Sequence, residues 1–256
     1  MNGARGPLKP TLAARALGGP LVHLDRTGST NDHARALALA GAPAGTVVMA
    51  EEQTAGRGRQ GRSWTAPRGR ALTLSVLLRP AAGQLALLPL ACAVATCEAC
   101  EAVASVRCAI KWPNDVLIDG RKVAGILIES RPQEGWAVVG IGLNVDTTAD
   151  ELDGELEATA TSLRIAGGHP VDRSAALVSL MAGLDRWVGD DAVGAELLLA
   201  AYRQRDALEG ERIAWSVGSE RLEGRAAGID EEGNLVVFTT SGERIALDAG
   251  EVHLLR

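Results

Sequence analysis

The sequence lacks an excess of positive charge. Its 26 lysines and arginines are outnumbered by 32 aspartates and glutamates, and the formal net charge is -6. Nucleic acid and anionic lipid carry charge of the same sign as the chain, so no general electrostatic attraction draws the protein to either. Any positively charged site must therefore be local.

Long hydrophobic runs are also absent. No run of eighteen apolar residues occurs, which excludes the usual transmembrane helix. Residues 1–20 have neither the long apolar segment nor the cleavage site of a secretory signal. We therefore expect a cytoplasmic protein with no membrane partner. Its 256 residues are enough for one well-buried core and a small second domain.

The cysteines and histidines do not have the spacing of a metal site. Cys97 and Cys100 form a C-x-x-C pair, but they lie in the alanine-rich run ACAVATCEACEAVA, without a second pair. We interpret them as small buried helix residues, and the four histidines are scattered along the chain. The sequence predicts no tightly bound metal.

Period-two hydrophobic patterning predicts several strands. They are TVVMA from Thr46, ALTLSVLL from Ala71, VAGILIES and WAVVGIGLNV. In the last of them Gly140, Gly142 and Asn144 share one face. Glycines at alternate strand positions remove side chains where another backbone or a flat ligand must approach closely. A bulge or tight sheet packing is the other interpretation of the same pattern.

Helices are expected in two longer stretches. Residues 84–104 are mainly helical in pattern, although Pro89 must start, kink or interrupt the helix. Residues 172–209 also have a helical pattern, with a break near 189–194. After Gly210 short strands alternate with turns, which indicates a separate small β-domain.

The segment TAGRGRQGRSW, residues 54–64, interleaves arginines with glycines and ends on Trp64. Glycine lets the backbone approach a phosphate group closely, and the guanidinium fork binds phosphate oxygens in pairs. The tryptophan adds a face for stacking on a flat ring. Taken alone, this loop leaves phosphate binding, RNA binding and a solvated flexible loop open.

Five segments occur in a fixed order along the chain. They are TGSTND with Ser29, Thr30 and Asn31, Gln53 with the loop AGRGRQGRSW, KWPND at 111–115, GRKVAGILIE at 120–129, and VGIGLNV at 139–145. Together these segments resemble the biotin protein ligases. The resemblance runs from about residue 21 to the C-terminal GEVHLL.

The resemblance implies an α/β (α+β) fold. Residues 21–209 would form a class II synthetase-like biotin/lipoate ligase catalytic domain, with a mixed, largely antiparallel sheet and helices. Residues 210–256 would form a small C-terminal SH3-like β-barrel. Residues 1–20 form an N-terminal extension, too short for the helix-turn-helix domain that makes some family members repressors, so we expect no DNA partner.

The resemblance also implies a two-step reaction. The carboxylate of biotin attacks the α-phosphate of ATP, which is supplied with Mg²⁺, and this gives biotinyl-5'-AMP and pyrophosphate. The ε-amine of one lysine on the biotin carboxyl carrier domain of a biotin-dependent carboxylase then takes the biotinyl group as an amide. Because the activated intermediate is a bound adenylate, no covalent enzyme nucleophile is needed.

Family roles transfer to this chain residue by residue. The resemblance implies a biotin site formed by Ser29, Thr30, Asn31, Gln53, Gly56, Arg57, Gly58, Arg59, Lys111, Gly125, Gly140 and Gly142. It implies an ATP site formed by Arg59, Arg62, Trp64, Lys111, Asn114, Lys122 and Asn144, and a catalytic group formed by Lys111, Arg57 and Arg59. Asp115 is a candidate Mg²⁺ contact, with an ordinary turn role for the Asn-Asp pair as the alternative.

Lys111 is the residue that we expect to be most important for the chemistry. A carboxylate must approach a triphosphate, and a fixed ammonium together with Mg²⁺ neutralises the like charges. The lysine stands directly before Trp112 and Pro113 in a rigid segment, which favours a functional role over a solvated surface position. Trp112 is interpreted as either pocket wall or core, and Asn144 as either a nucleotide contact or a strand-end cap.

One position departs from the family pattern. Gln60 stands where many relatives place a basic residue, which weakens the expectation of a phosphate contact there. Two other functions stay open: a lipoate protein ligase, which shares the fold and the adenylate chemistry, and a noncatalytic or regulatory biotin-binding protein. GRGRQGRSW together with KWPND favours biotin over lipoate, and Lys111 with the full loop favours an enzyme.

Overall fold

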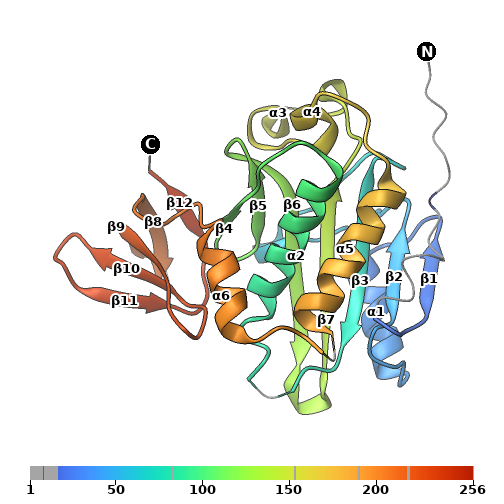
Figure 1. The fold of residues 1–256 in the computed structure, drawn as a ribbon, viewed down its shortest axis with the longest axis horizontal. Helices are drawn as coiled ribbons and strands as arrows, with labels where there is room; N and C mark the ends of the chain where they lie inside the picture. The colour runs from blue at the N-terminus through green and yellow to red at the C-terminus, as the bar shows by residue number, and fades with distance from the viewer. Residues whose placement is uncertain are drawn as a thin grey trace.

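The computed structural model of the chain describes residues 8, 17–81, 83–152, 154–189, 191–217 and 220–255. These residues form two β-sheets, with helices packed around the larger one (Figure 1). No helix among them is long and apolar enough to cross a membrane.

The larger sheet is formed by seven strands. They are β1 (Leu21–Leu24), β2 (Val47–Ala50), β3 (Ala71–Leu78), β4 (Ala109–Lys111), β5 (Asp115–Ile118), β6 (Arg121–Arg131) and β7 (Trp136–Asn144). Their order across the sheet is β1-β2-β3-β7-β6-β5-β4. β1 and β2 are parallel, and the other neighbouring pairs are antiparallel. This confirms the predicted mixed, largely antiparallel sheet.

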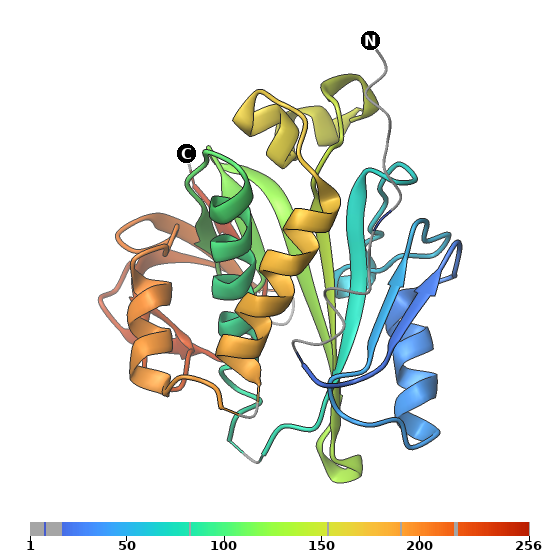
Figure 2. The same cartoon turned by 45° about the vertical axis from the view of Figure 1, so that its right-hand side comes forward.

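Two long helices cover one face of the larger sheet (Figures 1 and 2). α2 (Leu88–Val103) and α5 (Arg173–Val188) lie side by side, and α6 (Ala195–Arg203) packs against α2. Pro89 lies in the first turn of α2, where its missing N–H removes no helical hydrogen bond, so it starts the helix and does not kink it. The predicted break near 189–194 separates α5 from α6.

The opposite face of the larger sheet carries α1 (Thr30–Leu39), which packs on β2, β3 and β7 (Figure 2). Because both faces are covered, all eight residues of β3 are buried. The described residues also form five short helical segments. They are α3 (Glu155–Thr159), α4 (Leu163–Gly167), and 3-10 turns at Arg59–Gly61, Pro132–Glu134 and Ala149–Glu151.

The smaller sheet is formed by the C-terminal part of the chain, red in Figure 1. Its strands are β8 (Arg212–Val217), β9 (Glu220–Ile229), β10 (Leu235–Thr239), β11 (Arg244–Leu247) and β12 (Val252–Leu254), in the antiparallel order β11-β10-β9-β8-β12. The buried Trp112, next to Lys111, donates a hydrogen bond from Nε1 to the carbonyl oxygen of Gly233 at 3.1 Å. The smaller sheet is thus joined to the larger one beside the lysine.

The glycines of β7 face the α1 side of the larger sheet. Gly140 stands opposite Ser75 of β3, and a Cβ on Gly140 would lie 2.2 Å from Oδ1 of Asn31. A Cβ on Gly142 would lie 2.3 Å from Cε2 of Trp64. The strand face that the sequence predicted to be bare is therefore filled by side chains from other parts of the same chain.

Candidate active site

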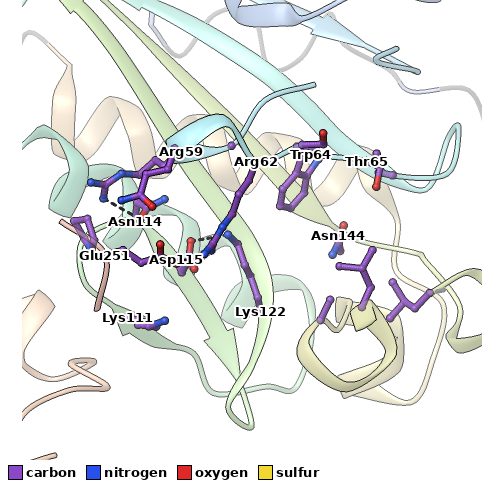
Figure 3. A pocket seen from close by; sticks show the side chains of 18 of the residues that line it. Arg59, Arg62, Trp64, Thr65, Lys111, Asn114, Asp115, Lys122, Asn144 and Glu251 are labelled. Carbon is purple, nitrogen blue, oxygen red and sulfur yellow. Dashed lines mark hydrogen bonds and ion pairs between the residues drawn. The ribbon is translucent and has the colours of Figure 1, made fainter. Parts of the chain in front are cut away.

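Two cavities adjoin the loop at residues 54–64. The larger, with a volume of about 510 Å³, is lined by this loop, by 111–115, by residues that follow β7 and by Glu251, directly before β12 (Figure 3). The smaller, with a volume of about 50 Å³, is lined by the start of α1, by Gln53 and by parts of β6 and β7. Residues shared by both linings form what we call the partition: Gly58, Arg59, Trp64, Asn114 and Lys122.

The start of α1 forms a polar end of the small cavity. Thr30 donates to Oε1 of Gln53 twice, from its backbone N at 2.7 Å and from Oγ1 at 3.0 Å. Ser29 is the N-cap residue of α1, and within the described chain its hydroxyl makes no capping hydrogen bond. The structure thus brings Ser29, Thr30 and Gln53, all predicted to bind biotin, to the same cavity.

Asn31 also lines the small cavity, but its side chain is held by the protein. Its Nδ2 donates to the carbonyl oxygen of Leu127 at 3.4 Å and to Oε2 of Glu129 at 3.1 Å. Its Oδ1 accepts a hydrogen bond from the hydroxyl of Ser75 at 2.6 Å. Both amide hydrogens are engaged, so the structure places this predicted biotin-binding residue as a support of the site.

Arg57, at the start of the loop, is held between two carboxylates. Its Nη1 donates to Oδ2 of Asp32 at 2.5 Å, and its Nη2 donates to Oε1 of Glu129 at 3.0 Å. The hydrogen bond from Arg57 lowers the pKa of Asp32, and the same bond raises the pKa of Arg57. The guanidinium that the sequence assigned to catalysis is therefore anchored to α1 and β6, and it holds the base of the loop.

Glycines let the loop fold back on itself. The backbone N of Gly58 donates to the carbonyl oxygen of Arg62 at 2.7 Å, and that of Trp64 donates to the carbonyl oxygen of Gly56 at 2.9 Å. A Cβ on Gly56 would lie 2.4 Å from the carbonyl oxygen of Trp64, so the fold-back requires glycine. At the tip Gln60, the position that departs from the family pattern, has a φ of 53° in the left-handed region.

Trp64 and Lys122 occupy the glycine face of β6 and β7. Cβ atoms on Gly142 and Gly125 would lie 2.3 Å and 3.4 Å from the indole of Trp64. The ammonium of Lys122 lies 5.9 Å from the centroid of the Trp64 ring and 2.6 Å from Oδ1 of Asp115 (Figure 3). The small volume of the smaller cavity follows from these two side chains.

Lys111, the last residue of β4, lines the large cavity (Figure 3). Within the described part of the chain, no carboxylate oxygen lies within 4.0 Å of its ammonium. Burial lowers the pKa of Lys111, and the more distant carboxylates of Asp115 and Glu251 oppose that shift. A half-buried cation without an ion-pair partner is a site for an anionic ligand, because an anion restores the stabilisation that burial removes.

Arg59 and Asn114 meet in the partition. Nη1 of Arg59 donates to Oδ1 of Asn114 at 3.2 Å, and Nδ2 of Asn114 donates to the carbonyl oxygen of Ile126 at 3.0 Å. Burial lowers the pKa of Arg59, and nearby carboxylates oppose that shift. Because a guanidinium has several N–H donors and Asn114 takes one, Arg59 keeps donors for a ligand.

Arg62 and Asn144 complete the predicted nucleotide side. Arg62 pairs with Glu251, which stands directly before β12, and both residues line the large cavity together with Asn144. Nδ2 of Asn144 donates to the carbonyl oxygen of Thr161 at 3.0 Å. This bond supports the strand-end interpretation of Asn144, and the position of the residue on the wall of the large cavity is consistent with a nucleotide contact.

Sequence reasoning missed the carboxylates that hold the arginines of the loop. Asp32, Glu129 and Glu251 all stand in segments that carry the family resemblance: TGSTND, GRKVAGILIE and GEVHLL. The available signal was charge, since partly buried arginines require carboxylates nearby when no anionic ligand is bound.

Metal ligands are not clustered in the described residues, because no three His, Cys, Asp or Glu side chains there are grouped to hold an ion. Cys97 and Cys100 are buried in α2, which confirms their interpretation as small buried helix residues, and all four cysteines are free.

Comparison with known proteins identifies the family. Residues 24–146 match the Biotin/lipoate A/B protein ligase family, and residues 210–255 match the Biotin protein ligase C terminal domain. The biotin–acetyl-CoA-carboxylase ligase of Paracoccus denitrificans is 39% identical over 241 residues, which cover 90% of this chain and 98% of that protein. The bifunctional ligase/repressor BirA of Bacillus spizizenii is 35% identical over 240 residues, which cover 90% and 73%.

Solved structures show the same relationship. The biotin protein ligase from Aquifex aeolicus in complex with biotin and ATP superposes with a TM-score of 0.78 at 28% identity, over 92% of this chain and 98% of that one. The ligase from Leishmania major in complex with biotinyl-5-AMP superposes with a TM-score of 0.60 at 26% identity, over 90% and 98%. Fold and site thus define an ATP-dependent ligase of a small carboxylic acid. The chain belongs to the biotin protein ligase family, as its sequence predicted.

Proposed function

We propose that the two adjoining cavities activate biotin as biotinyl-5'-AMP, and that the biotinyl group then passes to a lysine of a biotin carboxyl carrier domain. The small cavity takes the ring system of biotin, and the large cavity takes ATP. The observation that carries this proposal is the partition, because its residues line both cavities. A carboxylate from one side and a phosphate from the other meet there beside Arg59.

The ring of biotin needs more room than the small cavity has. Its volume of about 50 Å³ is far below the roughly 300–1,000 Å³ of typical small-molecule pockets. Trp64 and Lys122 occupy the missing space over Gly125 and Gly142. We infer that these two side chains move when the ring enters, after which the glycine backbone lines the ring.

In the first step an oxygen of the biotin carboxylate attacks the α-phosphorus of ATP. The bond from this phosphorus to the bridging oxygen of pyrophosphate breaks, and pyrophosphate takes the electron pair. Lys111 and Arg59 neutralise the negative charge that both reactants bring. Arg57 stays paired with its carboxylates and acts by holding the loop.

Mg²⁺ enters with ATP as part of the substrate. In nucleotide sites it binds through one or two carboxylates, phosphate oxygens and water. Asp115 offers a carboxylate on the wall of the large cavity and is already paired with Lys122 at 2.6 Å. These residues fit a metal that the nucleotide carries, and we propose no resident metal.

In the second step the neutral ε-amine of the carrier lysine attacks the acyl carbon of the adenylate. AMP leaves with the electron pair of the broken bond, and the amine nitrogen releases a proton to water to give the amide. Trp64 offers a stacking face to the adenine in the large cavity. No side chain of the ligase forms a covalent bond to the substrate in either step.

The domain division and the location belong to the same proposal. The catalytic domain would span residues 21–209, and residues 210–256 would form a small domain that contributes Glu251 to the large cavity. Free buried cysteines suit the reducing cytoplasm that the sequence predicted.

The experiment is exchange of labelled pyrophosphate into ATP, with biotin, with lipoate or with neither acid. Exchange that requires biotin, followed by biotin on the lysine of an added carrier domain, supports the proposal. Exchange only with lipoate would make the protein a lipoate ligase. Biotin binding without exchange would make it a noncatalytic biotin-binding protein.

A further inference from the structure

A row of oxygen atoms, on three buried residues and on the half-buried Gln53, lies beside the small cavity. The hydroxyl oxygen of Ser75, on β3, lies 2.6 Å from Oδ1 of Asn31 and 2.8 Å from Oγ1 of Thr30. Oγ1 of Thr30 lies in turn 3.0 Å from Oε1 of Gln53. We call these four residues the hydroxyl chain. Ser75 is fully buried, and neither the sequence motifs nor the reaction above gives it a role.

The hydroxyl chain has too few hydrogens for its contacts. Ser75 and Thr30 each supply one hydroxyl hydrogen, but the chain has three oxygen–oxygen contacts. The amide hydrogens of Asn31 point elsewhere, and Oε1 of Gln53 is an acceptor because it already receives the backbone N–H of Thr30. No other donor in the described chain reaches these oxygens, so every arrangement leaves one contact without a hydrogen.

The position of the missing hydrogen can shift along the chain. While Thr30 donates to Gln53, the single hydroxyl hydrogen of Ser75 must serve both Asn31 and Thr30, and one of these two contacts lacks a hydrogen. When the hydroxyl of Thr30 turns to donate to Ser75, and Ser75 donates to Asn31, the contact between Thr30 and Gln53 is the one left without a hydrogen. Thr30 and Gln53 both line the small cavity. A ligand N–H placed there completes the chain. A ligand without a donor leaves two oxygen atoms of the hydroxyl chain in contact with no hydrogen between them, which costs free energy.

We propose that Ser75 is a positioning residue that leaves the small cavity one hydrogen-bond donor short, so that the cavity selects a ring that carries N–H. The inference rests on the function proposed above. The ring of biotin is a cyclic urea with N–H donors, whereas the dithiolane ring of lipoate has none. Ser75 acts through Thr30 and Gln53, and it lies outside the segments that carry the family resemblance.

The test combines a protein variant with a ligand variant. Wild type and Ser75→Ala are titrated calorimetrically with biotin and with biotin methylated on either ureido nitrogen, and KM and kcat are measured in pyrophosphate exchange. In Ser75→Ala the hydroxyl of Thr30 always has Gln53 as its acceptor, so that contact no longer lacks a hydrogen. The steric cost of the methyl group is common to both proteins and cancels in the ratio.

We expect methylation at one of the two nitrogens to weaken binding to wild type about tenfold more than binding to Ser75→Ala, the scale of one hydrogen bond. The effect should appear in KM and not in kcat, because the reacting carboxylate lies at the partition. A residue with a merely structural role would change the affinity for both ligands by the same factor.

Two further variants keep the test decisive. Thr73→Val removes a buried hydroxyl from the same strand, but this hydroxyl donates to the carbonyl oxygen of Ala50 at 2.7 Å and lies outside the hydroxyl chain. Thr73→Val should keep the wild-type ratio of the affinity for biotin to the affinity for methylated biotin. Ser75→Cys, with the weak donor of a thiol, should give an intermediate ratio and replaces Ser75→Ala if that variant does not fold.

Different results would contradict the proposed function and the role of Ser75. If wild type shows no biotin-dependent exchange, the proposed function falls and the role of Ser75 falls with it. If wild type is active but the ratio of the affinities for biotin and methylated biotin is the same in Ser75→Ala as in wild type, only the inference about Ser75 is overturned. The same holds if Thr73→Val changes this ratio as much as Ser75→Ala does.

Discussion

Arg62 of the loop pairs with Glu251, the residue before β12 of the smaller sheet, and both side chains line the large cavity (Figure 3). The wall of the proposed nucleotide site is therefore held by the C-terminal part of the chain. The side chain of Arg62 is 66% exposed and that of Glu251 is 24% exposed, so the pair contributes only about 0–1 kcal/mol to stability. Its main effect is on the position of the loop.

Glu251→Ala should therefore weaken the use of ATP more than it weakens the fold. We expect the KM for ATP to rise by roughly fivefold, equivalent to about 1 kcal/mol, with an unchanged melting temperature. Pyrophosphate exchange at varied ATP measures the first, and thermal unfolding the second. Glu223→Ala is the matched control, because Glu223 pairs with Arg212 within the smaller sheet. Equal KM values in the two variants would refute the role of Glu251.

Lys111→Ala should slow adenylation by roughly 10²- to 10³-fold, the scale for losing one preorganised group that stabilises developing charge. Stability should change little, because the lysine is only half-buried and has no ion-pair partner within the described residues. Biotin-dependent pyrophosphate exchange is the measurement, and biotin affinity should suffer less than the rate. Exchange near the wild-type rate would exclude Lys111 from the chemistry.

Arg59→Gly should release the adenylate before the carrier arrives. The change removes the contact to Asn114 in the partition, so the loop closes less firmly over a mixed anhydride that reacts with any amine. We would incubate the variant with biotin, ATP and albumin, and measure biotin on the albumin. Arg68→Gly, which loses a surface pair with Asp25, is the control. Adenylation without excess labelling of albumin would contradict a retaining role for Arg59.

Gly142→Ala and Gly140→Ala should separate activity from stability. The new methyl group at Gly142 meets Trp64, which the loop carries and can move, so activity should fall strongly while stability falls little. At Gly140 it meets Asn31, which hydrogen bonds hold in place, so the free energy of unfolding should fall by about 1–3 kcal/mol. Denaturant unfolding and pyrophosphate exchange on both variants give the comparison. The opposite ranking would show that these contacts are assigned wrongly.

Local patterns in the sequence predicted much of this fold. The alternating glycines of β7 and the loop between β2 and β3 follow from periodicity and composition, which act over a few residues. What fills the glycine face was not predictable in this way. Asn31 reaches Gly140 because β7 lies between β3 and β6 while α1 covers that side, and this order is set by contacts between distant segments.

In the candidate site, too, the residues were predictable from local motifs, whereas their contacts with distant segments were not. The motifs predicted Lys111, Thr30 and Gln53, and the structure places all three on the two cavities. The pairing of Arg57 with Glu129 was missed, because a motif shows which charge is present but not which opposite charge the fold brings beside it.

The hydrogen bond from Trp112 to Gly233 has a consequence for protein engineering. A replacement for the C-terminal sheet would need a carbonyl oxygen at this point and a turn narrow enough to pass Leu90, whose Cδ1 would lie 2.9 Å from a Cβ on Gly233. Chimeras that exchange this sheet between ligases should therefore lose activity even when both halves fold, because the contact between Trp112 and the turn at Gly233 is not reproduced. An insertion in the turn at Gly233 should displace Lys111, because Trp112, the residue next to Lys111, is hydrogen-bonded to Gly233.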